Sequence, residues 1–167
     1  MAEVNGILNG ATGSVDSDAG GYPASQAIDG NSGTFWHSGG SLPHWIKYDL
    51  GSPKAGGNYK VKPRISGDAH AWVDFTFEGS NDDVEWTVLD GQVGLNWTTG
   101  EEKSFICGNI ALYRYYRWHI TKTTSMAYAT AAELSIAEST LPLPRNYLAA
   151  GRRNRLCMKG VSVNNLE

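Results

Sequence analysis

The ten residues AIDGNSGTFW, at positions 27–36, combine an oxygen-rich turn with two large aromatic side chains. The turn holds a carboxylate, an amide, two hydroxyls and two glycines, and Phe35 and Trp36 follow it directly. Calcium takes side-chain and backbone oxygens in a loose geometry, so a turn of this composition suits that ion. The aromatic rings would anchor the turn to a hydrophobic core. This stretch favours a binding module over an enzyme.

The composition of the whole chain is typical of an all-β protein. The 167 residues include six Trp, eight Tyr and twenty Gly, with a formal net charge of −3. Aromatic and glycine enrichment suits strands joined by tight loops, and this charge gives no electrostatic reason to expect nucleic acid binding. No apolar run approaches the roughly 20 residues of a membrane span. The N-terminus lacks the basic and apolar regions of a secretory signal.

Segments with strand patterns follow one another along the chain, separated by turn signals. The clearest is VDFTFEGS at 73–80, which places Val73, Phe75 and Phe77 on one buried face. No window of helical length shows a 3.6-residue period. The other predicted strands are residues 45–50, 59–65, 86–89, 103–107, 113–122 and 133–137. Strands at this spacing predict a β-sandwich.

Five motifs lie in an order that resembles a known family. They are AIDGN to TFW at 27–36, WIKYDLG at 45–51, FEGSND to EW at 77–86, YYRW at 115–118 and AEL at 132–134. This order resembles the discoidin fold of coagulation-factor C-type domains, which includes the family 32 carbohydrate-binding modules. The resemblance implies an eight-stranded antiparallel jelly-roll β-sandwich of the galactose-binding type, with its binding loops at one end. We expect an N-terminal arm over residues 1–20, the sandwich over 21–138 and a C-terminal extension over 139–167.

The resemblance also implies a structural calcium site that joins the turn at 27–36 to the segment at 132–134. By position, Asp29 and Glu133 would supply carboxylates, which would roughly balance the charge of the ion. The remaining oxygens would come from Asn31, Thr34, Ala132 and a residue near Ala24 or Gln26. The alternative is that Asp29 only caps the turn and Glu133 only pairs with a surface cation.

Three loops outside the strand patterns are candidates for ligand recognition: residues 67–72, 94–100 and 123–128. A sugar site needs a flat apolar face and a few fixed polar groups. We expect Trp72 or Trp97 to supply the face. The expected polar partners are Asp68, His70, Asn96 and Arg64, with His37 and Tyr128 as lesser candidates. The resemblance implies the alternative for Arg64, because Arg64 and Arg117 match family arginines that mostly support the scaffold. Alternatively, these aromatic residues pack on a neighbouring chain. The tryptophans inside strand motifs, Trp36, Trp45, Trp86 and Trp118, are expected in the core.

No pattern in the chain indicates catalysis. The nucleophile elbow, the zinc-protease helix, the phosphate loop and the Cys-x-x-Cys pair are all missing from the sequence, and the four histidines lack ligand spacing. We therefore expect a non-catalytic protein. We also expect Cys107 and Cys157 to be free buried thiols, with a single disulfide as the alternative.

The C-terminal residues suggest a docking tail. LPLP at 141–144 is a stiff linker, and four arginines and a lysine follow it between 145 and 159. The alternative is a disordered tail.

A small module with such a tail and no signal suits a bacteriophage virion protein, a tail, fibre or decoration subunit that binds host cell-surface glycans. Such a protein would be made in the cytoplasm and carried on the particle, docked on other virion proteins and expected to form a homo-oligomer. A purely structural virion protein without sugar binding is the main alternative, and lipid-headgroup binding through residues 95–97 is a third hypothesis.

Overall fold

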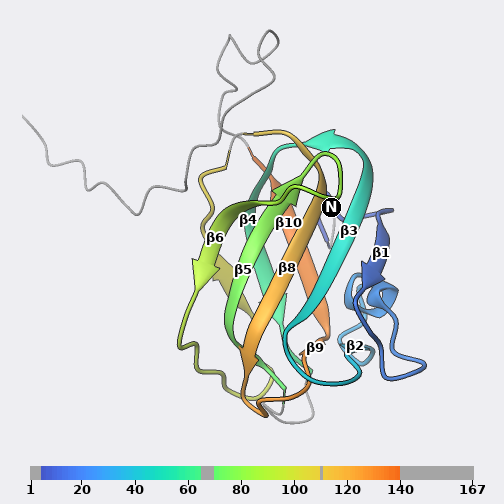
Figure 1. Cartoon of the computed structure of the whole chain (residues 1–167), viewed down its shortest axis with the longest axis vertical. Coiled ribbons are helices and arrows are strands. Elements are labelled where there is room, and N and C mark those ends of the chain that lie inside the picture. Colours follow the sequence, from blue (N-terminus) through green and yellow to red (C-terminus); the bar gives the residue numbers. More distant parts are fainter. Residues whose placement is uncertain (1–4, 65–69, 110, 140–167) are drawn as a thin grey trace, which may run out of the picture.

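Two antiparallel sheets face each other in the fold, and a third, two-stranded sheet lies at one end (Figure 1). The structure is a computed structural model that describes residues 5–64, 70–109 and 111–139. The larger sheet has the order β1 (Thr12–Val15), β3 (His44–Lys54), β8 (Tyr113–Thr123), β5 (Trp72–Ser80) and β6 (Thr87–Gln92). The smaller sheet has the order β10 (Glu133–Glu138), β4 (Gly56–Lys62) and β7 (Lys103–Phe105). The short strand β2 (Trp36–His37) pairs with β9 (Thr130–Ala131), and a single 3-10 turn, η1 (Ala24–Ala27), precedes β2.

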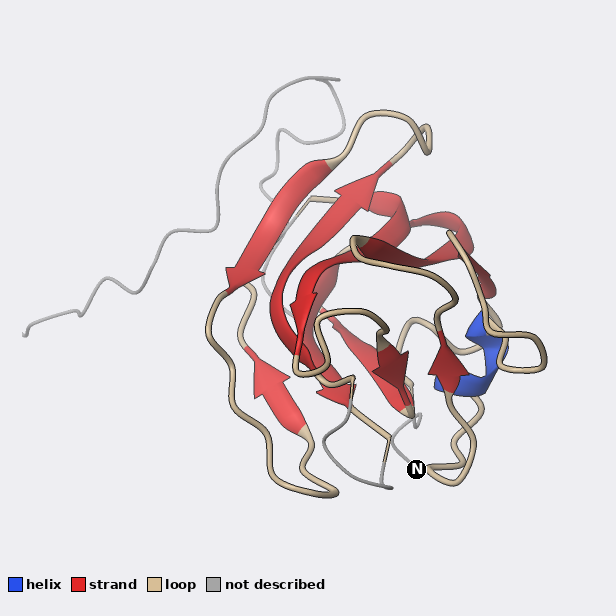
Figure 2. Ribbon diagram, turned by 60° about the horizontal axis from the view of Figure 1, so that its bottom comes forward, coloured by secondary structure: helices blue, strands red, loops and turns tan. Residues whose placement is uncertain are grey.

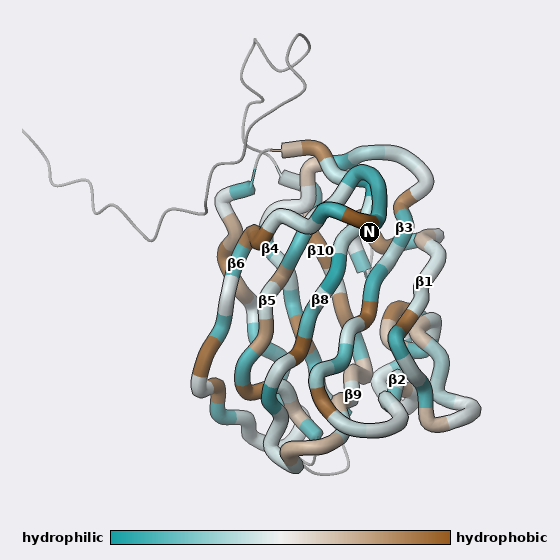
Figure 3. The backbone as a smooth tube through the Cα atoms, in the orientation of Figure 1, coloured by the Kyte–Doolittle hydropathy of each residue, from teal (hydrophilic) through white to brown (hydrophobic). Residues whose placement is uncertain are grey.

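The strands follow from the alternation of apolar and polar residues, which Figure 3 shows along β5. Phe75 and Phe77 are buried, and they pair in register with Ile120 and Trp118 of β8. Val73, predicted on the same buried face, is only half-buried, because the register of β5 shifts between Trp72 and Phe75. Tyr59 of β4 brings the opposite sheet onto the same core, with its ring 4.3 Å from that of Phe77. The predicted all-β sandwich of the galactose-binding type is confirmed.

The core consists mainly of aromatic rings. The Trp118 ring lies at its centre, 5.1 Å from Phe77, 6.1 Å from Tyr59, 6.3 Å from Tyr48 and 6.4 Å from Trp72. All five residues are at most 1% exposed. Burial of a large apolar side chain stabilises a fold by about 1.5–3 kcal/mol, so this cluster is a main source of the stability of the sandwich.

Two of the four tryptophans expected in the core lie elsewhere. Trp36 and Trp118 have no exposed surface, as predicted. Trp45 and Trp86 are only half-buried, which corrects the prediction. Trp45 occupies an outward position of β3, where buried and half-buried residues alternate, and the Arg117 guanidinium lies 4.0 Å above the Trp86 ring.

The first described residues are part of the sandwich, although the sequence suggested an arm over 1–20. β1 pairs with β3 along its full length. Before it, the Ile7 amide donates to the Ile136 carbonyl at 2.8 Å, and Leu8 has no exposed surface. These contacts attach the segment to both sheets. The tail predicted from residue 139 onward lies outside the described residues except for Ser139.

Cys107 is buried, with its thiol 3.6 Å from the Leu89 carbonyl. Cys157 lies outside the described residues, so the state of the two thiols stays a prediction. Within residues 5–64, 70–109 and 111–139, no helix has the length and apolar character to span a membrane.

Candidate functional site

One end of the sandwich gathers several loops around β2 and β9. It is the lower end in Figure 1, and Figure 2 turns it toward the viewer. β3 begins at this end with His44, β5 begins there with Trp72, and β8 finishes there with Thr123. Segments far apart in the sequence therefore contribute side chains to one surface.

Five rings meet at this end, and we refer to them as the ring cluster: Tyr22, Phe35, His37, His70 and Tyr128. The centroids of His37, His70 and Tyr128 form a triangle with sides of 5.2, 5.3 and 5.4 Å. Tyr22 lies 6.0 Å from His37 and stacks on Phe35 at 5.0 Å. Tyr22 and Tyr128 are 39% and 40% exposed, so the cluster is open to solvent.

The backbone around β9 positions both histidines. In β2, Trp36 points into the core and His37 points outward, because successive strand residues face opposite sides. His37 is paired in register with Thr130, and the Thr130 amide donates to the His70 carbonyl at 3.2 Å. His70 has a φ of 73°, in the left-handed region that non-glycine residues avoid. Such strain gathers at functional sites, where surrounding structure maintains it.

Arg64 extends the ring cluster with a positive charge. Its guanidinium lies 5.1 Å from the Phe35 ring centroid. Its Nε is buried and has no hydrogen-bond partner among the described residues, and the same is true of Nδ1 of His70. A buried polar atom without a partner is costly, and both of these atoms belong to residues at the ring cluster.

The two imidazoles differ in their surroundings. Burial lowers the pKa of His70, and the charges of His37 and Arg64 lower it further. His70 is therefore neutral near pH 7. His37 has its Nδ1 2.7 Å from the Ser38 carbonyl, so this nitrogen carries the proton. When His37 is neutral, its Nε2 is left as a hydrogen-bond acceptor.

The two tryptophans expected to form the sugar platform are buried, which corrects that prediction. Trp72 has no exposed surface and Trp97 is 8% exposed. The Trp97 indole donates to the Trp72 carbonyl at 2.6 Å, and the Lys103 ammonium lies 5.1 Å from the Trp97 ring centroid. Trp72 is the first residue of β5 and points into the core. Neither ring offers a face to a ligand.

The other predicted ligand residues have different outcomes. His70 belongs to the ring cluster, next to His37 and Tyr128, the two lesser candidates. Asn96 is exposed, and its part in ligand binding stays a prediction. Asp68 lies outside the described residues. Sequence reasoning missed Tyr22 and Phe35 as surface rings. For Phe35 a signal existed, because its neighbour Trp36 was assigned to the core and alternation then turns Phe35 outward.

The turn of residues 29–34 is closed by its own side chains. The Asp29 carboxylate accepts from the Asn31 amide at 2.9 Å and from the Thr34 hydroxyl at 2.7 Å. The Thr34 hydroxyl also lies 2.7 Å from the Asn31 carbonyl, and the Asn31 side chain accepts from the Gly33 amide at 3.0 Å. Carboxylate, hydroxyl and carbonyl oxygens are thus concentrated in one short loop.

Glu133 faces this turn from the start of β10. Its Oε2 accepts from the Asn5 side chain at 2.9 Å, whereas its Oε1 is buried and has no hydrogen-bond partner among the described residues. Burial raises the pKa of Glu133; the Asn5 side chain and the Asn31 backbone oppose this shift, and the nearby Asp29 carboxylate adds to it. Two carboxylates that repel each other beside neutral oxygens form a donor set that calcium prefers. The residues therefore fit such an ion, with Ala132 buried beside Glu133.

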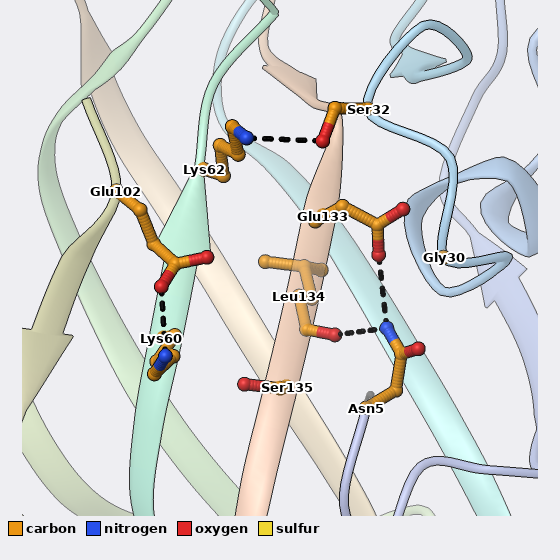
Figure 4. Close-up of a pocket in the computed structure, with 9 residues that line it drawn as sticks. All are labelled: Asn5, Gly30, Ser32, Lys60, Lys62, Glu102, Glu133, Leu134 and Ser135. Atoms are coloured by element: carbon orange, nitrogen blue, oxygen red, sulfur yellow. Dashed lines mark hydrogen bonds and ion pairs between the residues drawn. The ribbon is translucent and has the colours of Figure 1, made fainter. Parts of the chain in front are cut away.

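Figure 4 shows a small polar pocket on the β10 side of this turn. Glu133, Gly30 and Ser32 line one part of it. On the other side, Lys62 donates to the Ser32 hydroxyl at 3.0 Å and Lys60 pairs with Glu102 at 2.8 Å. The described residues include no group of three or more His, Cys, Asp or Glu side chains that could hold a metal. A cation here would depend on backbone and hydroxyl oxygens in addition to Asp29 and Glu133.

Several solved structures of similar fold are sugar-binding modules. A family 32 module of NanJ from Clostridium perfringens, solved with galactose, is 23% identical, with a TM-score of 0.69 over 79% of this chain and 97% of that one. A chitosan-binding module from a Paenibacillus chitosanase/glucanase, solved with chitotriose, is 21% identical, with a TM-score of 0.66 over 76% and 95%. The lectin domain of lectinolysin, solved with Lewis B antigen, is 22% identical, with a TM-score of 0.67 over 83% and 99%.

At these sequence identities, the similarity shows a shared fold and does not assign a ligand to this chain. A search among curated proteins found no match. The family comparison is decisive, because the model of the F5/8 type C domain matches residues 11–134, from just before β1 into β10. The chain belongs to the F5/8 type C domain family, the discoidin-type family that its motifs resemble.

Proposed function

We propose that this protein is a non-catalytic glycan-binding module and that its ligand binds at the ring cluster and Arg64. The observation that carries the proposal is the open group of rings at the loop end, in which two tyrosines are about 40% exposed. Ring faces accept the C–H face of a pyranose, and the imidazole, phenol and guanidinium groups supply donors and acceptors for hydroxyls. This combination of apolar faces and few polar groups is the usual make-up of a small-ligand site.

The similar structures support the proposal by their ligands. Galactose, chitotriose and Lewis B antigen are bound by three modules of this fold. These sugars differ in chemistry, so the fold alone does not select one of them. The choice must come from the loop side chains, which in this chain are those of the ring cluster.

We also propose that calcium binds between the 29–34 turn and Glu133 and has a structural role. The support is the unpartnered buried Oε1 of Glu133 and its repulsion from Asp29. A bound divalent ion would neutralise both carboxylates and connect the turn to β10. It would act on stability and would not contact the ligand at the ring cluster.

The setting that we propose is a bacteriophage particle, where the module would bind host surface glycans while residues 139–167 dock on another virion protein. The support for this setting is the basic sequence of the tail, whose residues from 140 onward lie outside the described part of the chain. Immunogold labelling of purified particles would test it. Particles that never carry the protein would contradict it.

The sugar-binding proposal is tested by titrating the protein with a panel of glycans, monitored by calorimetry and by NMR. His37→Ala and Tyr128→Ala should each weaken binding at least tenfold, which corresponds to about 1.4 kcal/mol. Ile106→Ser is the matched control, because Ile106 is 85% exposed and follows β7, outside the ring cluster. If a glycan binds and both ring variants bind it like wild type, the site is elsewhere. If no glycan binds at millimolar concentration, with calcium present, the protein is a structural module.

A further inference from the structure

We infer that the ligand of the ring cluster is a saccharide that carries a carboxylate, and that its binding strengthens as the pH falls below 7. This inference rests on the proposed function and names the substrate class of the same site. Two observations carry it: an arginine without an anionic partner, and a pair of histidines placed beside it.

Arg64 differs from the other two arginines that the structure describes. Arg114 binds both carboxylate oxygens of Asp49 at 2.8 and 2.7 Å, and Arg117 binds Glu78, with its Nε 2.8 Å from the carboxylate. Arg64 forms no ion pair within residues 5–64, 70–109 and 111–139, and its buried Nε has no hydrogen-bond partner there. A carboxylate satisfies a guanidinium better than any neutral group, because it accepts two charge-assisted hydrogen bonds.

The two carboxylates of the loop that contacts β2 are already engaged. The 16–21 loop contacts β2, since the Ala19 amide donates to the His37 carbonyl at 2.9 Å. Within this loop, Asp16 pairs with His44 at 2.8 Å, and Asp18 accepts from the Gly20 amide at 2.7 Å. The loop before β9 contributes Tyr128 and places the Ala127 carbonyl 3.2 Å from Nε2 of His44. The described ionisable groups of the site are therefore two imidazoles, two phenols and one guanidinium, with no acidic side chain to balance Arg64.

The pH dependence follows from the same arrangement. Burial, His37 and Arg64 all keep His70 uncharged, as its lowered pKa indicates. A ligand carboxylate between Arg64 and the histidines would offset the two charge repulsions and favour a protonated imidazole. The complex would then hold more protons than the free protein. Affinity therefore rises as the pH falls, and it levels off once His70 of the free protein is itself protonated. Uptake of one proton allows up to about a tenfold change in affinity for each pH unit.

For an uncharged sugar, we expect the affinity to fall at lower pH or to stay unchanged. A neutral imidazole can accept a hydrogen bond from a sugar hydroxyl, and protonation removes that acceptor. The sign of the pH effect therefore separates a carboxylated ligand from an uncharged one at the same site.

The experiment compares uronic and sialic acid methyl glycosides with their uncharged methyl esters, at pH 5.5 and 7.5, by calorimetry. The panel contains the galacturonide, the glucuronide and the sialoside, each with its ester. We expect at least one acid to bind ten times more tightly than its ester at pH 5.5, and this ratio to fall at least fivefold at pH 7.5. Arg64→Gln should bring the ratio close to one. Arg64→Lys, which keeps the charge, should retain part of it. His70→Gln should remove the pH dependence of the ratio.

Asp68→Asn is a necessary comparison, because Asp68 is the carboxylate closest to Arg64 in the sequence and lies outside the described residues. If the acid gains affinity only in this variant, wild-type Arg64 is already neutralised and the inference is wrong. Equal binding of acids and esters at both pH values, with loss of binding in His37→Ala, overturns the inference and leaves the proposed function standing. Absence of binding to every sugar, by a protein whose thermal unfolding is cooperative, overturns both.

Discussion

Replacing Asp29 by Asn tests whether the 29–34 turn holds a cation or is only a capped loop. The substitution removes one of the two carboxylates that would bind calcium. It keeps a side-chain oxygen that can accept the hydrogen bond from the Asn31 amide, 2.9 Å away in the wild type. The two hypotheses therefore differ mainly in the presence of calcium.

Without calcium, the effect should be small. Asp29 makes two side-chain hydrogen bonds in an exposed loop, and Asn retains the capacity for one of them. A typical hydrogen bond contributes about 0.5–1.5 kcal/mol net. Removing the Asp29 charge also relieves its repulsion of Glu133, whose pKa Asp29 raises. We expect the free energy of unfolding in EDTA to change by no more than about 1 kcal/mol.

With calcium, the difference should be large. An ion that binds only the folded state stabilises it by about 2.7 kcal/mol at one hundred times its Kd. For a domain of this size, 1 kcal/mol corresponds to roughly 4 °C in Tm. The wild type should therefore gain about 10 °C in saturating calcium, and Asp29→Asn should gain little.

Differential scanning calorimetry in EDTA, in calcium and in magnesium measures these shifts. Asp82→Asn is the matched control, because Asp82 also caps a turn, accepting from the Val84 and Glu85 amides at 2.9 Å, but belongs to another loop. It should lower Tm in every buffer and keep the calcium shift. Equal Tm values for the wild type in calcium and in EDTA would refute the cation site, and so would an undiminished calcium shift in Asp29→Asn.

Three further substitutions test the core, the N-terminal contact and the ring cluster. Trp72→Ala should lower the free energy of unfolding by about 3–5 kcal/mol in urea titrations, because it leaves a cavity in the core; a loss below 1 kcal/mol would mean that Trp72 is not packed as described. Asn5→Ala should lower the free energy of unfolding by about 1–3 kcal/mol, since the Asn5 side chain donates to Glu133 and, at 2.8 Å, to the Leu134 carbonyl. The N-terminal segment should also be cleaved faster by proteases, and an unchanged rate of cleavage would contradict this. The pKa of His70 is lowered in the folded state. The free energy of unfolding should therefore have its full value above about pH 6.5 and should decline as the pH falls through the lowered pKa. His70→Gln should flatten this part of the Tm profile against pH, and an identical profile would show that another group titrates.

The sandwich could be predicted because period-2 alternation is a local signal. In β5, Phe75 and Phe77 are buried and Thr76 between them is half-buried, as the pattern required. The same reasoning failed for Trp72 because the glycine and aspartate before it suggested a loop, and the strand begins with Trp72 itself. Trp97 has no strand periodicity around it. Its burial depends on the Trp72 carbonyl and Lys103, which only the tertiary structure brings together.

The ring cluster was harder to predict than the fold, because its members come from separate loops. His70 and Tyr128 were selected as loop residues, but nothing in the sequence shows that they lie 5.4 Å apart. That distance depends on β9, which bonds to the backbone of His70 and pairs with β2. β2 and β9 have two residues each, too few to produce a pattern.

The segment from Asp29 to His37 contributes to both candidate sites. Thr34 bonds to Asp29 in the turn, Phe35 lies under Arg64, Trp36 enters the core, and His37 joins the ring cluster. Because these four residues are consecutive, a shift in the turn moves the rings. Substitutions between 29 and 37 will therefore change stability and recognition together. Tyr22, Arg64, His70 and Tyr128 lie outside this segment. Their variants therefore report on ligand binding more independently of the turn than His37→Ala does.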